Sequence, residues 1–350
     1  MSEHRPAADG DPRDAAVRGL TEAVRLLDRA LSPRSKVTAF QRAAQVVAAL
    51  DPDELVSRVR SSTLTELAGI GPSTAAVIAD SVEGRPSQYL ARLDERTRID
   101  PGVGGPVLER LRGDLHSHTT WSDGGASIED MARAAMALGH EYLVVTDHSP
   151  RLTVAHGLSP ERLAAQLEEI EEVRERVAPF RILTGMEVDI HPDGSLDLDD
   201  DLLARLDLVV ASVHWKLSMD ADQMTRRLVL AAANPHVDVL GHCTGRKVVG
   251  RGRPQSRFDA DLVFTACAQF GTAVEVNCRP ERQDPPAELL QLALEHGCLV
   301  SINTDAHAPG QLEWQPYGAD KAVRCEVAPE RIVNTWDVDE LLSWTSSHPT

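Results

Sequence analysis

The chain has 350 residues, of which 42% are hydrophobic, and this size and composition suit one large globular domain with a smaller one beside it. No stretch approaches the ~18 apolar residues of a membrane-spanning helix, and the five cysteines form no Cys-x-x-Cys pair, which argues against a cysteine-ligated zinc site and a disulfide framework. The charged amino terminus lacks the apolar core of an export signal, so we expect a reduced, cytoplasmic protein without membrane contacts.

The formal net charge is −18, which taken alone argues against a nucleic-acid-binding protein. The charge is unevenly distributed, however. Residues 1–112 hold 16 basic and 16 acidic side chains, so the other 20 basic and 38 acidic side chains lie in residues 113–350. An acidic domain that handles phosphates needs bound cations to reverse the local sign of the charge. The distribution is therefore a first indication of metal ions.

The amino-terminal part predicts a small all-α domain. Residues 1–12 are polar and are expected to form a disordered tail, whereas apolar residues recur at helical spacing from residue 13 onward. Within the domain, which we place at residues 13–98, the segment "TLTELAGIGPSTAAVIADSVEG" contains two helical runs separated by Gly69-Ile70-Gly71. Residues 99–112 are rich in glycine and proline and are expected to form a linker.

After Gly113, short apolar runs alternate with amphipathic helical patterns. The apolar runs are residues 142–146, 181–188, 208–213, 237–241, 272–277 and 299–303. The helical patterns between them are residues 127–139, 159–177, 220–233, 259–270 and 286–297. So many strand–helix units in roughly 200 residues predict a parallel sheet that closes into a barrel.

Polar side chains cluster where the predicted strands end, which is where a barrel presents its chemistry. Six of the 13 histidines lie there: His116, His118, His148, His214, His242 and His307. They are accompanied by Asp123, Glu187 and Asp305. A single histidine is more often a hydrogen-bonded structural residue, and we give that role to His140, His156, His191, His236 and His296. Imidazoles and carboxylates suit Zn²⁺, Mn²⁺ or iron, and nine candidates for about four ligands per ion indicate two or three ions.

The motifs of residues 113–350 resemble those of the PHP (polymerase and histidinol phosphatase) metallohydrolases. The matching segments are "DLHSHTTWSDG", "VVTDHS", "GMEVDI", "ASVH", "GHCTGR" and "INTDAH". The resemblance implies an α/β fold, a distorted (β/α)₇ barrel with a trinuclear metal centre at its carboxyl-terminal mouth.

The same resemblance implies a distribution of the nine ligands over three divalent ions. The first ion would be bound by His116, His118, Glu187 and Asp305. The second ion would be bound by Asp123, His148 and His307. The third ion would be bound by Glu187, His214 and His242, so that Glu187 bridges two ions. Asp123, Glu187 and His307 are the residues expected to act directly in catalysis.

Residues 13–98 resemble the small amino-terminal domain of family X DNA polymerases, and "LAGIGPSTAAVI" is similar to its helix-hairpin-helix motif. Such a hairpin offers backbone N–H groups to DNA phosphates, here at Gly69, Ile70 and Gly71. The alternative is a hairpin that only packs. The nucleotidyl-transfer region of that family is missing, because residues 99–112 are too few to hold it, so no polymerase is expected. Val77 stands where lyase-competent relatives place a Schiff-base lysine, so no lyase is expected either.

Together these features predict a phosphoric ester hydrolase, of phosphatase or 3′–5′ exonuclease type, in which a metal-activated hydroxide attacks phosphorus. Its expected substrates are DNA 3′ ends or nucleotide-type phosphate esters, with DNA held by the hairpin domain. Arg246, Arg279 and Arg282 are candidates to clamp a second phosphate, the alternative being surface ion pairs. Two other functions stay open: a small-molecule phosphatase of the histidinol-phosphate kind, and a DNA-binding accessory protein with a structural metal centre.

Overall fold

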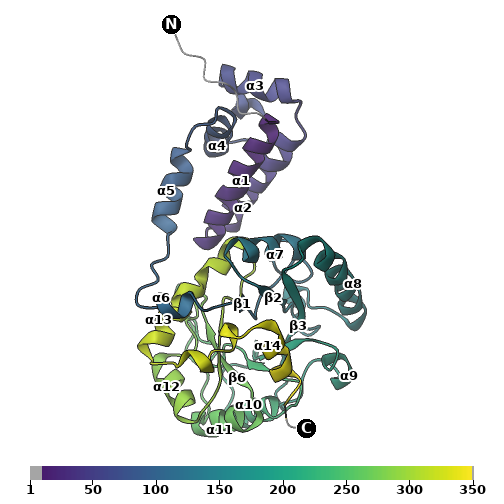
Figure 1. The fold of residues 1–350 in the computed structure, drawn as a ribbon, viewed down its shortest axis with the longest axis vertical. Coiled ribbons are helices and arrows are strands. Elements are labelled where there is room, and N and C mark those ends of the chain that lie inside the picture. Colours follow the sequence, from purple (N-terminus) through teal and green to yellow (C-terminus); the bar gives the residue numbers. More distant parts are fainter. Residues whose placement is uncertain (1–9, 349–350) are drawn as a thin grey trace. The chain divides into compact units, whose positions relative to one another are not determined.

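The computed structural model describes residues 10–348, which divide into two compact units between residues 98 and 99. The first unit is all-helical, and the second contains a seven-stranded parallel sheet that is nearly closed into a barrel (Figure 1). The predicted fold class is therefore confirmed. Most of the tail predicted for residues 1–12 lies outside the described residues. The first helix already begins at Pro12, because the Asp11 side chain caps it by accepting a hydrogen bond from the backbone N–H of Arg13.

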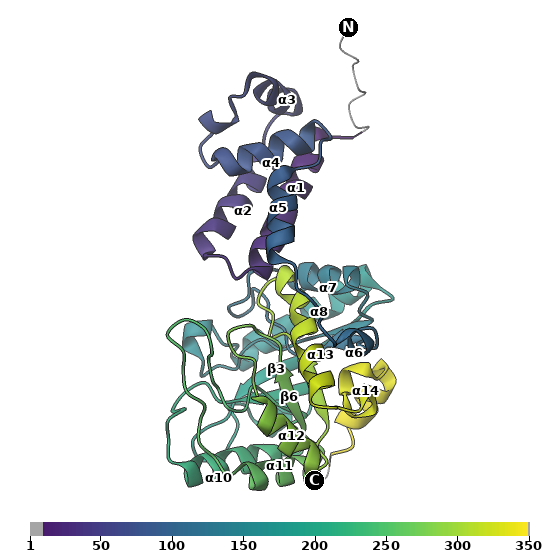
Figure 2. The same cartoon turned by 90° about the vertical axis from the view of Figure 1, so that its left-hand side faces the viewer.

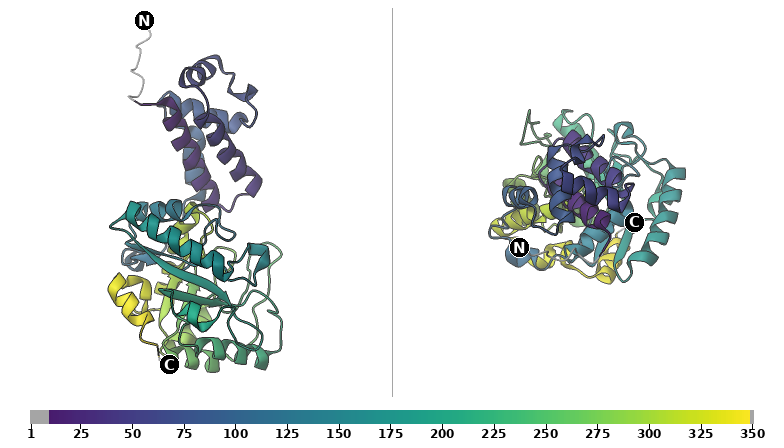
Figure 3. Two further views of the ribbon diagram at one scale, coloured as in Figure 1. Left: turned by 90° about the vertical axis from the view of Figure 1, so that its right-hand side faces the viewer. Right: turned by 90° about the horizontal axis from the view of Figure 1, so that it is seen from above.

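The helical unit is built from helices whose apolar residues recur every three or four positions. Ala16, Leu20, Ala23 and Leu27 of the first helix are fully buried and face the core of this unit. The elements are α1 (Pro12–Arg29), α2 (Arg34–Ala48), α3 (Pro52–Ser61), η1 (Leu64–Glu66), α4 (Pro72–Val82) and α5 (Gln88–Thr97). Figure 3 shows them in purple to blue.

Of the two helical runs predicted on either side of Gly69-Ile70-Gly71, the second is α4, whereas the first is only the 3₁₀ turn η1. Gly69 has φ +96°, a conformation that a residue with a side chain rarely adopts, and Gly71 directly precedes α4. The N–H of Gly71 donates to Oγ1 of Thr74, and that hydroxyl donates back to the carbonyl of Gly71, both at 2.9 Å. Gly69 and Gly71 are exposed, but the side chain of Ile70 is buried in the helical core. The DNA contact expected of Ile70 was through its backbone N–H, which here donates to the carbonyl of Leu67 at 3.1 Å.

Residues 99–112, which composition predicts to be a linker, belong to the second unit. The N–H of Val103 donates to Oδ1 of Asp320 at 3.0 Å, and a Cβ added at Gly104 would lie 2.4 Å from the backbone nitrogen of Asp320. This segment contains α6 (Gly105–Leu108), which contacts α13 (Gln315–Arg324). The glycines of this segment thus allow its backbone to pack closely against α13.

The second unit contains seven strands that pair in sequence order, each parallel to the next. They are β1 (Gly113–Asp114), β2 (Tyr142–Val145), β3 (Arg181–Asp189), β4 (Leu208–Ser212), β5 (Val239–Leu240), β6 (Ala273–Asn277) and β7 (Val300–Asn303). Nearly every strand residue is buried, because the outer face of the sheet is covered by helices and the inner face closes on itself. This double burial explains why the strands are continuous apolar runs in the sequence.

Helices cover the outside of the barrel, with α10, α11 and α12 lying side by side (Figures 1 and 2). The α-helices besides α6 and α13 are α7 (Ile128–Ala137), α8 (Pro160–Val177), α9 (Asp200–Leu203), α10 (Ala221–Ala232), α11 (Ala260–Phe270), α12 (Ala287–Glu295) and α14 (Val338–Thr345). The 3₁₀ turns are η2 (Thr153–Ala155), η3 (Pro309–Trp314), η4 (Pro329–Arg331) and η5 (Val333–Thr335). Within residues 10–348, no helix has the length and apolar character needed to cross a membrane.

Side chains close the seam between β1 and β7, which share no continuous ladder among the described residues. The buried Nδ2 of Asn334 donates to the carbonyls of Gly113 (3.2 Å) and Ile302 (3.0 Å), while its Oδ1 accepts from the N–H of Ile302 at 2.7 Å. Farther along the seam, Ser117 and Ala306 form a single parallel bridge. One asparagine amide thus replaces the missing strand pairing at the start of the barrel.

We predict that Asn334→Ala lowers the free energy of unfolding of the barrel by about 2–4 kcal/mol, because buried backbone groups of both strands lose their partner. Tryptophan fluorescence during urea unfolding measures this change, since all five tryptophans lie in the second unit. Gln223→Ala, on the exposed face of α10, is the control. Equal unfolding midpoints for the two variants would contradict the role of the asparagine.

Candidate metal centre

All nine predicted ligands lie at the carboxyl ends of the barrel strands. Because neighbouring strands are parallel, residues that follow different strands meet at the same mouth. The histidines follow β1 (His116 and His118), β2 (His148), β4 (His214), β5 (His242) and β7 (His307). The carboxylates lie in the loop after β1 (Asp123), within β3 (Glu187) and after β7 (Asp305).

The carboxylate of Glu187 is the centre of this cluster, and its side chain is completely buried. Five imidazoles approach it within 3.6 Å. Their distances from the nearer carboxylate oxygen are 2.8 Å for His242, 2.9 Å for His148, 3.2 Å for His214, 3.3 Å for His116 and 3.6 Å for His118. A single glutamate therefore connects residues from five of the seven strands.

A second carboxylate, Asp123, gathers ligands nearer to the surface. Its Oδ1 lies 3.4 Å from Nε2 of His307 and 3.5 Å from Nε2 of His148. On the β7 side, Oδ1 of Asp305 lies 3.4 Å from Nε2 of His118. Three groups of residues place their donor atoms within 4.8 Å of one another: His118, Asp123, His148 and His307; His116, His118 and Glu187; and His148, Glu187 and His214.

These groups share most of their members with the predicted ligand sets, but no group is identical to a predicted set. His118 belongs to two of the groups, and His148 links the Asp123 group to Glu187. His242 falls outside the groups but forms a hydrogen bond with Oε1 of Glu187 at 2.8 Å. The sharing of ligands between adjacent groups is what a multinuclear metal site requires.

Buried polar atoms without hydrogen-bond partners show that the cluster suits metal ions. Among the described residues, the unpartnered atoms at the mouth include His116 Nε2, both ring nitrogens of His118, Asp123 Oδ1, His148 Nδ1, Glu187 Oε2, His214 Nε2 and His242 Nδ1. Several of these atoms approach one another closely, but without the alignment of a hydrogen bond. Burying an unpaired polar atom costs about 1–3 kcal/mol, so such a concentration is unfavourable unless ions satisfy it. The residues present therefore fit a multinuclear divalent-ion site.

The carboxylates of the cluster are held ionised. Burial by itself would raise the pKa of Glu187, but the imidazoles of His214, His116 and His148 bring that pKa well below its usual value. Burial alone would likewise raise the pKa of Asp305, but the close approach of His118 and the charge of His116 lower it well below its usual value. Both carboxylates thus carry the negative charge that a metal ligand needs.

The histidines divide into two kinds. Burial lowers the pKa of His118 well below its usual value, and the neighbouring His307 and His148 lower it further, so this ring is a free base. Burial opposes protonation of His116 and His214 as well, but nearby carboxylates, including Glu187, raise the pKa of His116 well above its usual value and that of His214 to about 9. Bound ions would replace the protons of these two rings.

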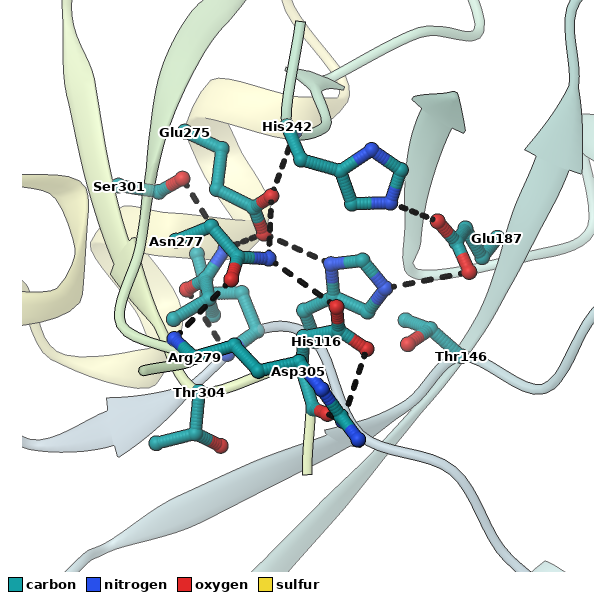
Figure 4. A network of polar contacts seen from close by, with 12 residues as sticks. His116, Thr146, Glu187, His242, Glu275, Asn277, Arg279, Ser301, Thr304 and Asp305 are labelled. Carbon is teal, nitrogen blue, oxygen red and sulfur yellow. Dashed lines mark hydrogen bonds and ion pairs between the residues drawn. The ribbon is translucent and has the colours of Figure 1, made fainter. Parts of the chain in front are cut away.

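Glu275 positions two of the ligands and was not identified from the sequence. Its Oε1 lies 2.7 Å from Nδ1 of His116, and its Oε2 accepts a hydrogen bond of 2.7 Å from the backbone N–H of His242 (Figure 4). The amides of Asn277 and Asn303 each donate to the same carboxylate at 3.1 Å. The signal that could have found it is a carboxylate in the middle of the apolar run "TAVEVN".

Two further buried aspartates position the loops that carry ligands. Asp147 accepts hydrogen bonds from the N–H (2.8 Å) and hydroxyl (2.6 Å) of Thr119, from Nε2 of Gln166 (2.6 Å) and from the hydroxyl of Ser122. It therefore holds the turn that leads to Asp123. Oδ1 of Asp189 lies 3.1 Å from Nδ1 of His214 and orients the other ring nitrogen toward Glu187.

The three arginines expected at the substrate take different positions. Nε of Arg282 lies 3.2 Å from Oδ2 of Asp305, and Nη1 of Arg279 donates to the backbone carbonyl of Asp305 at 2.8 Å and lies 3.1 Å from Nδ1 of His307. Arg246 instead donates to the carbonyls of Arg282 (3.1 Å) and Gln283. Arg279 and Arg282 thus border the ligand cluster, while Arg246 braces the loop that carries them.

Comparisons with known proteins find a domain family and several proteins that are similar to this chain. The PHP domain family matches residues 114–262. The DNA polymerase/3'-5' exonuclease PolX of Bacillus subtilis (strain 168) is 41% identical over 227 residues, which are 65% of this chain and 40% of that protein. The chain thus spans about two fifths of the length of this relative.

Phosphatases are also similar to this chain. A probable phosphatase of Thermoanaerobacter sp. (strain X514) is 29% identical over 205 residues, which cover 55% of this chain and 78% of that protein. Among solved structures, histidinol phosphate phosphatase from Lactococcus lactis subsp. lactis Il1403, complexed with zinc, L-histidinol and phosphate, has a TM-score of 0.40 and 18% identity. That alignment covers 57% of this chain and 87% of the phosphatase chain.

We predict that Glu187→Gln removes most of the bound metal, because the neutral amide can neither balance the charge of an ion nor bridge two ions. Elemental analysis of the gently purified chain measures the metal content, with two to three equivalents of Zn, Mn or Fe expected for the unaltered protein. His296→Ala, at the end of α12 outside the cluster, is the control and should retain the metal. Equal metal content in both variants would show that Glu187 is not a ligand.

Proposed function

This chain is a PHP domain protein, and from that premise we propose that it is a metal-dependent phosphoesterase acting on DNA 3′ ends or on nucleotide-type phosphate esters. The observation that carries the proposal is the convergence of five imidazoles on the buried carboxylate of Glu187. The relatives support the reaction class, since one is named a 3'-5' exonuclease and others probable phosphatases.

The nine ligands would hold three divalent ions, of which zinc, manganese and iron suit the donor atoms. Bound ions lower the pKa of water toward ~7 and offset negative charge that develops on a phosphoryl group. The chain contributes the arrangement around them. Glu187 supplies the central negative charge at full burial, and Glu275, Asp147 and Asp189 keep the surrounding ligands oriented.

Asp123 and His307 are suited to face the substrate, because their side chains are the most exposed of the nine, at 34% and 21%. Burial opposes ionisation of Asp123, but the adjacent ring of His307 and the charges of the neighbouring histidines keep its pKa well below the usual value. Nε2 of His307 lies 3.4 Å from that carboxylate, so both side chains would hold an ion at the edge of the cluster that the phosphoester approaches. Arg279 and Arg282 would bind the other phosphate oxygens, with Arg246 fixing their loop.

One observation favours a second candidate, a small-molecule phosphatase in which the helical unit only packs. Ile70 is buried, and the N–H of Gly71 is bonded to Thr74 inside the hairpin, so fewer groups of the Gly69–Gly71 turn point outward than the motif resemblance implies. DNA contacts would then depend on Gly69, the exposed face of Gly71 and the amino terminus of α4.

We expect the chain with Mn²⁺ or Zn²⁺ to hydrolyse at least one member of a panel of single-stranded DNA, duplex DNA, nucleoside bisphosphates and histidinol phosphate. Glu187→Gln should lower turnover of that substrate more than 10²-fold, on the scale of losing strong transition-state stabilisation. His296→Ala should retain the activity. A similar loss in both variants would place the active site elsewhere, and preferential hydrolysis of histidinol phosphate would favour the second candidate.

Removal of the helical unit separates the two candidates. If the hairpin binds DNA, a chain of residues 99–350 should hydrolyse a small phosphoester nearly as fast as the full chain but show a higher KM for DNA. The slope of log K against log salt for duplex DNA should become shallower by about one or two units, since each phosphate contact contributes roughly −0.9. Identical KM and slope for the two chains would assign the helical unit a packing role.

A further inference from the structure

A strongly basic loop lies at the mouth of the acidic barrel unit, between β5 and α11. This cationic loop, residues 245–258, contains no acidic side chain. Its five basic residues are Arg246, Lys247, Arg251, Arg253 and Arg257. They are five of only 20 basic residues in the part of the chain, residues 113–350, that carries 38 acidic ones. Because the loop begins three residues after His242, it starts at the metal centre.

The cationic loop is a defined hairpin. The backbones of Lys247 and Arg253 are hydrogen-bonded in both directions, at 2.9 and 2.8 Å, and form an antiparallel bridge. Gly250 and Gly252 supply the positive φ angles of the turn, at +73° and +64°. Nε of Arg253 donates to the carbonyl of Gly245 at 2.6 Å and fixes the base of the hairpin. The backbone positions from which the cations extend are therefore defined.

Hydrogen bonds attach the cationic loop to neighbours of the metal cluster on two sides. The N–H of Val248 donates to the carbonyl of Glu281 at 2.7 Å, within the segment that carries Arg279 and Arg282. On the other side, the hydroxyl of Ser256 donates to the carbonyl of Leu217 at 2.8 Å, three residues after His214. The loop thus continues the surface that begins at the arginines beside Asp305.

Several cations of the loop have no acidic partner. Among residues 10–348, no carboxylate lies within ion-pair distance of Lys247, Arg251 or Arg257. Burial and the positive charges of Arg282 and Arg253 lower the pKa of Lys247 and outweigh the opposing charge of Glu281, so like charges predominate around this side chain. Such repulsion is relieved when an anion binds.

Exposed apolar and aromatic groups accompany these charges. Val248 and Val249 at the tip are 48% and 56% exposed. On the Leu217 side, the guanidinium carbon of Arg151 lies 4.1 Å from the ring centroid of Trp215, and Nζ of Lys216 lies 5.0 Å from it. Sites for single-stranded nucleic acid typically combine cations that bind the phosphate backbone with apolar and aromatic side chains that contact the bases.

We propose that the cationic loop binds the backbone of a single nucleic-acid strand whose terminal phosphoester reaches the metal centre. This rests on the proposed phosphoesterase function and specifies its substrate class. One phosphate monoester could be bound by Arg279 and Arg282 alone, whereas Lys247, Arg251 and Arg257 add charge that only a ligand with several phosphates can match. The net negative charge of the barrel unit repels polyanions elsewhere on its surface, which makes the loop the selective site.

The test uses the full chain with the double substitution Lys247→Ala and Arg251→Ala, whose side chains make no hydrogen bond that the fold requires. The matched control is Arg181→Ala with Arg205→Ala. It removes the same charge from exposed positions near the amino-terminal ends of β3 and β4, at the opposite end of the barrel. Binding of a fluorescent 12-nucleotide oligothymidine is measured by anisotropy on the metal-loaded proteins, with phosphorothioate linkages in the oligonucleotide to slow hydrolysis.

We expect the loop variant to raise the Kd about tenfold relative to the control and to make the slope of log K against log salt shallower by about 1.4, from roughly 0.7 for each lost single-strand contact. In turnover assays with an unmodified 12-mer, the ratio of kcat/KM for the 12-mer to that for p-nitrophenyl phosphate should fall about tenfold. Equal Kd and slope in the loop variant and the control would overturn the proposal.

Two other results would also overturn it: duplex DNA that binds as tightly as the single strand, or poly-glutamate that competes as well as unlabelled oligonucleotide. Failure of the proposed function is a separate result, because it would appear as no hydrolysis of any phosphoester by the unaltered chain. The anisotropy measurement does not depend on turnover and so judges the strand-binding proposal in either case.

Discussion

The buried carboxylate of Glu187 is the constraint on which the rest of the barrel mouth depends. A fully buried anion is costly unless positive or hydrogen-bonding groups surround it, and here five imidazoles from four other strand ends do so. Each of these rings needs its own orientation, which explains the outer layer of carboxylates. Glu275 contacts His116, and Asp189 contacts His214. The buried charged groups of the site therefore stabilise one another, and none of them would be stable at its position without the others.

The way in which the barrel closes also positions this cluster. β1 has only two residues, and the loop that follows it carries His116 and His118. The position of that loop is set by the seam: Asn334 joins Gly113 to Ile302, and the Ser117–Ala306 bridge lies between the two histidines. Residues near the end of the chain therefore determine where the first ligands lie. A barrel closed by side chains can hold an irregular loop at the seam, where a continuous ladder would impose a regular strand.

The charge at the barrel mouth differs from the charge of the rest of the barrel unit. The barrel unit is acidic overall, yet its mouth combines a cation-binding cluster, Arg279 and Arg282, and the cationic loop. Positive charge is thus concentrated where a phosphate would react. Acidic surface elsewhere disfavours non-specific association with polyanions.

The sequence by itself determined the fold class and the set of nine clustered residues, because strand and helix periodicity and strand-end motifs are local properties of the chain. Tertiary structure alone decided what depends on contacts between distant residues. Glu275 could not be assigned because its partner His116 is 159 residues away, and Arg246 faces the Arg282–Gln283 loop for a similar reason. Composition suggested a linker at residues 99–112, where Gly104 permits close packing against Asp320. A motif suggested free backbone N–H groups at Gly69–Gly71, but those of Ile70 and Gly71 are hydrogen-bonded within the hairpin. Local patterns record which conformation a segment prefers, but only the closed barrel and the packed helices decide which side chains meet.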